Sequence, residues 1–124
     1  MGRGLCAFNR IYLSVAPSSN VEIGDCFVIK SGEGINLLSR NLRASIYVGH
    51  GANLKIGNNS GMSSASIWVN ESITIGNNVN IGANSTIIDT DAHSLDWRVR
   101  MTTEDTFCAK NAPIVIGDGV FIGM

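Results

Sequence analysis

Isoleucine residues recur along this chain at a spacing of six, and a glycine follows most of them. The clearest run covers Ile75, Ile81 and Ile87, and related units begin at Ile56 and Ile116. A six-residue period fits neither an amphipathic helix nor an alternating strand, and a short fixed period of this kind indicates a parallel β-helix. We therefore expect an all-β fold in which each unit forms one strand and one bend, with three units per triangular coil.

Each position of the six-residue unit has a physical role in such a coil. The isoleucine is expected to point into the prism and to stack on its equivalents in neighbouring coils. The glycine and asparagine residues that follow are suited to corners with left-handed or strained backbone angles. The position four after the isoleucine should face inward at the crowded corner, as at Val79, Ser85 and Val120.

Two parts of the chain follow the period poorly. Within residues 29–48, Ile35, Leu37, Ile46 and Val48 alternate as strand residues do, but corner glycines are scarce, so we expect imperfect coils there. Residues 1–20 are interpreted as an N-terminal cap with one strand that ends at Pro17, because an open solenoid end needs cover. This divides the chain into a cap at 1–20 and a β-helix domain at 21–124.

One long interruption separates the last two isoleucine units, and we expect it to protrude as a loop over about 89–112. Ile87 and Ile116 are 29 positions apart, which is more than one coil requires. Residues 89–110 contain eight of the 19 charged residues of the chain, together with Trp97 and Phe107. Long loops in compact repeat proteins usually carry function, so we expect the chemistry of the protein here.

Composition narrows the class of protein further. A net charge of −1 provides no basic surface for nucleic acid, and no apolar run reaches the length of a membrane-spanning helix, so a soluble protein without membrane insertion is expected. The three cysteines Cys6, Cys26 and Cys108 contain no Cys-x-x-Cys pair, which argues against a disulfide framework and a zinc site. Cys26 is expected to be a small buried residue, and the cysteine usage favours a reducing, cytoplasmic compartment.

The isoleucine units, the Asp89–Trp97 segment and the re-entry at Ala112–Gly123 together resemble the hexapeptide-repeat acyltransferases. The resemblance covers about Ile56 to Met124, and it is strongest with the sugar O-acetyltransferases, which include galactoside, maltose and surface-polysaccharide enzymes. It implies a left-handed parallel β-helix, acetyl-CoA as the co-substrate, a sugar or polysaccharide hydroxyl as the acceptor, no metal and a homotrimer.

The resemblance also implies a catalytic role for His93. This residue would be the general base that removes the proton of the acceptor hydroxyl, and a histidine suits the task because its unperturbed pKa is about 6.5. Asp89 and Asp91 are the candidates to fix the second ring nitrogen of His93. The further implied residues are Ser64, Trp97 and Arg98 for the acceptor, and Phe121, Gly123 and the backbone N–H of Met124 for the acyl donor.

Three alternatives accompany this interpretation. Relatives continue for several coils beyond the position of Met124, so we expect a fragment, and a non-catalytic β-helical module that retains the trimer is the second hypothesis. His93 could also be a loop residue that only bonds a neighbouring aspartate, and His50 is interpreted as a turn residue. A zinc-dependent hydratase needs three histidine ligands, and the chain contains two histidines.

Overall fold

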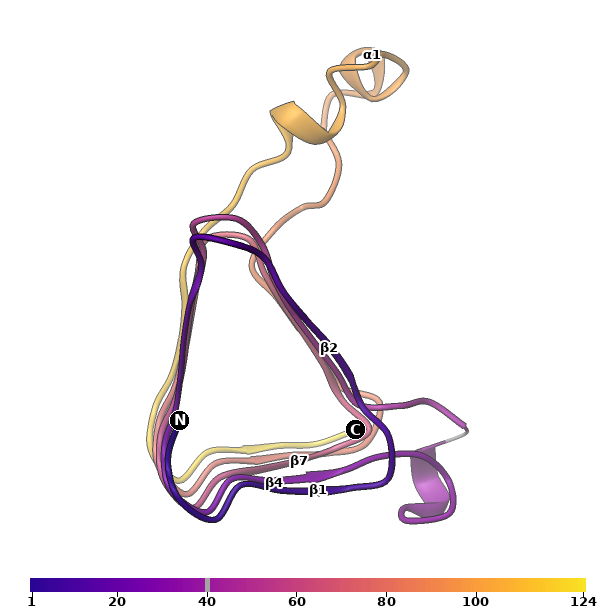
Figure 1. Cartoon of the computed structure of the whole chain (residues 1–124). Helices are drawn as coiled ribbons and strands as arrows, with labels where there is room; N and C mark the ends of the chain where they lie inside the picture. The colour runs from indigo at the N-terminus through magenta and orange to yellow at the C-terminus, as the bar shows by residue number, and fades with distance from the viewer. Residues whose placement is uncertain (40) are drawn as a thin grey trace.

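Three parallel sheets form the sides of a triangular prism, so the predicted left-handed parallel β-helix is confirmed (Figure 1). The computed structural model describes residues 1–39 and 41–124. Sheet A contains β1 (Cys6–Phe8), β4 (Val28–Lys30), β7 (Gly61–Ser63), β10 (Asn80–Ile81) and β13 (Phe121–Ile122). Sheet B contains β2 (Tyr12–Val15), β5 (Ser45–Val48), β8 (Ser66–Val69) and β11 (Thr86–Ile88). Sheet C contains β3 (Asn20–Ile23), β6 (Asn53–Ile56), β9 (Ser72–Ile75) and β12 (Ile114–Ile116).

The core is a set of columns of inward-facing side chains that run along the prism. Ile56 pairs in register with Ile75, and the two side chains are 2% and 1% exposed. Val79 is fully buried at the crowded corner, as the repeat predicts, and Phe27 fills the equivalent position of an earlier coil. Burial of a Val, Leu, Ile or Phe side chain contributes about 1.5–3 kcal/mol, so these stacked columns dominate the stability of the coils.

Glycine is required at the corners after Ile23, Ile56 and Ile75 because successive coils approach closely there. A Cβ on Gly57 would lie 2.6 Å from the carbonyl carbon of Gly76, and one on Gly76 would lie 2.8 Å from that of Gly117. The next residue in each corner bonds the adjacent coil through its side chain. The Asn77 side-chain oxygen accepts the N–H of Asn58 at 2.8 Å, and Asp118 accepts the N–H of Asn77 at 2.7 Å.

Two segments leave the prism at different vertices (Figure 1). The first, which we call the leucine loop (residues 31–44), connects β4 to β5 and contains the 3₁₀ turn Leu37–Ser39. Residues 29–48 thus form an imperfect coil, with β4 and β5 on either side of the loop, but Ile35 and Leu37 lie in the loop rather than in a strand and are 45% and 93% exposed. Only Ile46 and Val48 of that alternating set face the core, in β5.

The second segment, which we call the arm (residues 89–113), connects β11 to β12 and matches the predicted excursion. It contains the one-turn helix α1 (Trp97–Arg100) and the 3₁₀ turn Thr106–Cys108, and it projects away from the prism at the vertex opposite sheet A. Large apolar side chains on the arm are exposed, including Leu95, Met101 and Phe107. The arm is therefore held by its base and its internal hydrogen bonds rather than by a core of its own.

Some sequence expectations at the N-terminal end also change. Strands β1 to β3 already form a complete first coil, so the coils start within the segment interpreted as a cap. Cys26 is exposed rather than buried, because it occupies a corner position with φ of 57°. Among residues 1–39 and 41–124, no helix is long and apolar enough to cross a membrane.

Candidate functional site

Asp89 fixes the base of the arm. Its carboxylate, 4% exposed, accepts three backbone N–H groups of the preceding coil: Asn70 at 2.6 Å, Glu71 at 2.8 Å and Ser72 at 2.8 Å. These three donors belong to the short corner between β8 and β9. Leaving the three N–H groups of this partly buried corner unpaired would be costly, so Asp89 has a structural role and its carboxylate is not available to His93.

The acidic partner of His93 is Asp105, which lies in the second half of the arm, just before the 3₁₀ turn Thr106–Cys108. The Nδ1 atom of His93 lies 2.6 Å from Oδ2 of Asp105, while the other carboxylate oxygen accepts the N–H of Ser94 at 2.8 Å. The Asp105 side chain is 15% exposed and that of His93 is 62% exposed. The expectation that Asp89 or Asp91 fixes the ring is therefore wrong, and we call His93 and Asp105 the arm dyad.

Hydrogen bonds lower the pKa of Asp105 below its usual value of 3.8. The first cause is the bond to the His93 ring, followed by the bond from Ser94 N–H, and the positive charge of Arg100 adds to them. An ionised carboxylate at Nδ1 favours the tautomer with the proton on that nitrogen. The other ring nitrogen, Nε2, then carries the lone pair and can accept a proton.

The turn that carries His93 is held by backbone contacts. The carbonyl of Asp91 accepts the N–H of His93 at 2.6 Å, and the N–H of Asp91 donates to the Lys110 carbonyl at 2.9 Å. Ala92 has a left-handed φ of 59°, which is uncommon for a residue with a side chain and often marks functional sites. Asp91 thus shapes the turn through its main chain and does not contact the imidazole ring with its carboxylate.

Trp97 and Arg98 lie in α1, further along the arm. Both Nε and Nη2 of Arg98 bond the Asp96 carboxylate, at 3.0 and 2.7 Å, and Asp96 also accepts the N–H of Arg98. These bonds lower the pKa of Asp96 and raise that of Arg98. Arg98 therefore pairs within the arm, whereas Trp97 is 66% exposed and free of such a contact.

The remaining predicted residues lie away from the arm dyad. Ser64 is buried at the corner between sheets A and B, where its hydroxyl accepts the N–H of Gly32 at 2.9 Å. Phe121, Gly123 and Met124 belong to or follow β13 of sheet A, on the side opposite the arm. One copy of the chain does not bring His93 and these donor-side residues together.

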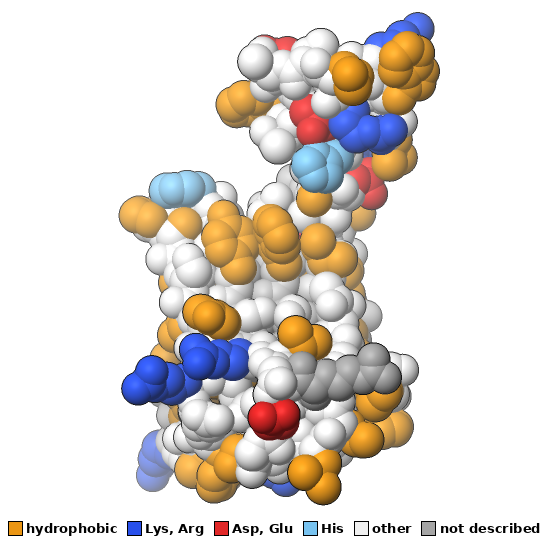
Figure 2. Space-filling view, turned by 90° about the vertical axis from the view of Figure 1, so that its right-hand side faces the viewer, with side chains coloured by type: hydrophobic (Ala, Val, Ile, Leu, Met, Phe, Trp, Pro, Cys, Tyr) orange, Lys and Arg blue, Asp and Glu red, His pale blue; other side chains and the backbone are white. Residues whose placement is uncertain are grey.

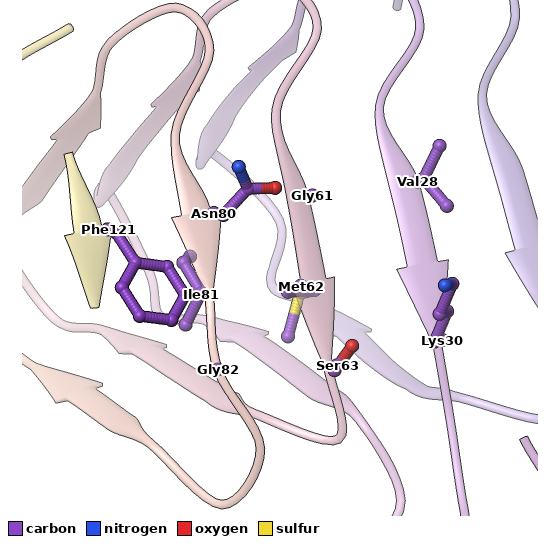
Figure 3. Close-up of a pocket in the computed structure, with 9 residues that line it drawn as sticks. All are labelled: Val28, Lys30, Gly61, Met62, Ser63, Asn80, Ile81, Gly82 and Phe121. Carbon is purple, nitrogen blue, oxygen red and sulfur yellow. The ribbon is translucent and has the colours of Figure 1, made fainter. Parts of the chain in front are cut away.

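Phe121 instead lines a shallow groove of about 380 Å³ on the outer face of sheet A (Figure 3). Gly61 forms its floor between Val28 and Asn80, because the glycine leaves the strand backbone uncovered. The Lys30 side chain lies at its edge, at the end of β4. The groove is open, and its lining combines aliphatic side chains, an aromatic ring, an amide and one cation.

A second feature lies on the outer face of sheet B, below the arm (Figure 2). Tyr47 and Trp68 are cross-strand neighbours with ring centroids 5.4 Å apart in an edge-to-face arrangement, and Ile88 follows in register. Trp68 Nε1 donates to the side chain of Asn70 at 3.0 Å. Because the N–H of Asn70 binds Asp89, this apolar row ends at the base of the arm.

Sequence reasoning missed Asp105 and Asn70. Asp105 lies 12 residues after His93 in the arm, and Asn70 lies on the preceding coil at the base of the arm. The only available signal for Asp105 was the concentration of acidic residues within the interruption. No family model, curated protein or solved structure matches this chain.

Proposed function

We propose that this chain is an acetyl-CoA-dependent O-acetyltransferase that acts on a sugar or polysaccharide hydroxyl, as the resemblance to the hexapeptide-repeat acyltransferases implies. The arm dyad is the observation that carries the proposal. A histidine whose Nδ1 bonds a carboxylate at 2.6 Å, and whose ring is mostly exposed, has the arrangement of a general base.

The proposed reaction is a direct transfer. Nε2 of His93 takes the proton of the acceptor hydroxyl, and the hydroxyl oxygen forms a bond to the thioester carbonyl carbon. The carbon–sulfur bond then breaks, and the leaving thiolate receives the proton from the imidazolium. Asp105 stabilises the imidazolium in between, because its ionised carboxylate lies against Nδ1.

The groove on sheet A suits the donor in chemical terms. The pantetheine part of coenzyme A is a flexible chain of methylene and amide groups, which matches a groove with an exposed strand backbone at Gly61 and an amide at Asn80. Lys30 offers a cation for a phosphate group at the edge of the groove. In this proposal, His93 of one subunit and the groove of a neighbouring subunit form one site in a homotrimer.

The surface below the arm suits the acceptor. Trp68 is 42% exposed and lies next to Asn70, so an aromatic face and an amide are available together. Aromatic side chains offer flat apolar surface, and amides bind hydroxyl groups in a directional manner. Asn70 replaces Ser64 in this proposal as the residue of the preceding coil that contacts the acceptor.

The second candidate function is a non-catalytic β-helical module. The observation that favours it is the separation of His93 from Phe121, Gly123 and Met124 within one chain. In that case the arm dyad stabilises the arm, and the protein binds no acyl donor.

Thiol release from acetyl-CoA, measured with a panel of sugars and oligosaccharides, tests the proposal. His93→Ala is expected to lower kcat/KM between about 10²- and 10⁴-fold, which is the usual contribution of a general base. His50→Ala is the matched control, because His50 lies in a corner and bonds only the Pro17 carbonyl, at 3.1 Å. Equal loss in both variants, or wild-type protein that binds no acetyl-CoA by titration calorimetry, would favour the non-catalytic module.

A further inference from the structure

The leucine loop exposes four large aliphatic side chains within eight residues. Ile35, Leu37, Leu38 and Leu42 are 45%, 93%, 60% and 53% exposed. Single exposed apolar residues are common, whereas a group of this size on one short segment marks a binding surface. Figure 1 shows the loop projecting outward from its vertex of the prism.

Hydrogen bonds hold the backbone of the loop at residues that the structure describes, so the exposed side chains do not result from a poorly packed segment. Gly32 N–H donates to Ser64 Oγ at 2.9 Å, and the Asn84 amide donates to the Leu38 carbonyl at 2.9 Å. Within the loop, Ser39 N–H and Oγ both donate to the Asn36 carbonyl. A loop with bonded backbone groups can enter an apolar environment at low cost.

Cations surround the base of the loop. Arg10 lies in the adjacent corner, Lys30 immediately precedes the loop, and Arg43 lies near its end, with Glu33 as the acidic residue beside them. Arg10, Lys30 and Arg43 are exposed and form no ion pair with a residue that the structure describes. The whole N-terminal part shares this bias, since residues 1–55 contain six Lys or Arg and three Asp or Glu.

We propose that the leucine loop docks the protein peripherally on an anionic lipid bilayer. The aliphatic side chains enter the headgroup region, while Arg10 and Arg43 contact lipid phosphates. A second copy of the chain is the competing occupant. The lipid surface is favoured because the four exposed apolar side chains are all aliphatic, and three cations against one carboxylate stand at the base of the loop, whereas protein interfaces are enriched in aromatic residues.

Flotation of the 124-residue chain with vesicles tests this proposal and requires no catalytic activity. The vesicles contain phosphatidylcholine alone, or phosphatidylcholine with about one third phosphatidylglycerol. We expect binding to the anionic vesicles, a loss of about tenfold or more in Leu37→Ser/Leu38→Ser, and roughly fivefold weaker binding for each of Arg10→Gln and Arg43→Gln. The control is Leu95→Ser/Phe107→Ser, which removes two equally exposed apolar side chains from the arm and should bind as wild type.

Circular dichroism confirms that each variant is folded. Absence of binding to anionic vesicles, equal binding to neutral ones, or an equal loss in the arm control overturns the proposal. A change in molecular mass of Leu37→Ser/Leu38→Ser in sedimentation experiments, without a change in flotation, assigns the loop to a second copy instead.

Discussion

At the scale of single residues, the contact between His93 and Asp105 determines which nitrogen of the ring is free to react. One carboxylate oxygen of Asp105 bonds the ring and the other accepts the N–H of Ser94, so the ring cannot rotate without losing its bond to Asp105. The lowered pKa of Asp105 keeps this carboxylate charged at neutral pH. The stabilisation that the ionised Asp105 gives to the arm is therefore fully present at a pH above the ordinary pKa of 3.8. It is lost as the pH falls through the lowered pKa of the folded state.

Asp105→Asn is expected to lower kcat/KM by about 10²-fold, because the amide stabilises the imidazolium less than a carboxylate does. Nitrogen NMR of the His93 ring should also show a smaller fraction with the proton on Nδ1. The matched control is Asp91→Asn, since Asp91 contacts the turn through its main chain. An unchanged tautomer together with full activity in Asp105→Asn would contradict the role of the dyad.

At the scale of the strand-and-corner element, each corner between a strand of sheet C and the following strand of sheet A places one residue in the left-handed backbone region. Asn59, Asn78 and Gly119 occupy this position in successive coils, and the two asparagines have φ of 55° and 57°. Cys26 occupies it in the first such corner, with φ of 57°. Asparagine and glycine tolerate this conformation, whereas a cysteine there is strained.

Cys26→Asn is therefore expected to raise stability by about 0.5–1 kcal/mol, since asparagine is favoured where the backbone is left-handed. Thermal unfolding should shift upward by about 2–5 °C. Cys108→Asn makes the same chemical change at an exposed position without a left-handed φ, and it should not stabilise the protein. If both variants raised the unfolding temperature equally, the gain in stability would come from removal of a cysteine and not from the left-handed backbone at position 26.

At the scale of the whole molecule, the arm and the sheet A groove lie on opposite sides of one prism. A site that uses both must combine two copies of the chain. Such an interface is heterologous, because one copy contributes the arm and the other contributes a different surface, and closed rings of copies arise from contacts of this type.

Coexpression of His93→Ala and Phe121→Ala chains tests this arrangement. Each variant alone is expected to be inactive or weak. In mixed assemblies, the His93 side and the Phe121 side of a shared site are each intact with a chance of about one half, so roughly a quarter of the sites should be active. Mixing the separately purified proteins without subunit exchange is the control. No recovery in coexpressed assemblies would contradict a site shared between copies.

The repeat predicted the coils, the inward columns and the position of the arm, because periodic packing follows directly from local residue pattern. It misread Ile35 and Leu37, since alternation of apolar residues occurs in a loop as well as in a strand. It also misplaced Cys26, whose φ depends on its corner rather than on its apolar character. Partners across the arm, such as Asp105 for His93, depend on how an irregular segment returns on itself, and no period describes that path.

The sequence by itself determined the left-handed coil architecture through the isoleucine period, the corner glycines and the resemblance that they support. Through that resemblance it also implied His93, within the long interruption after Ile87, as the candidate general base. Only the tertiary structure decided that Asp89 holds the preceding coil, that Asp105 holds the ring, and that the donor-side residues face away from the arm. The physical reason is that coil packing is local and repetitive, whereas these contacts join residues across corners and excursions that have no repeating pattern.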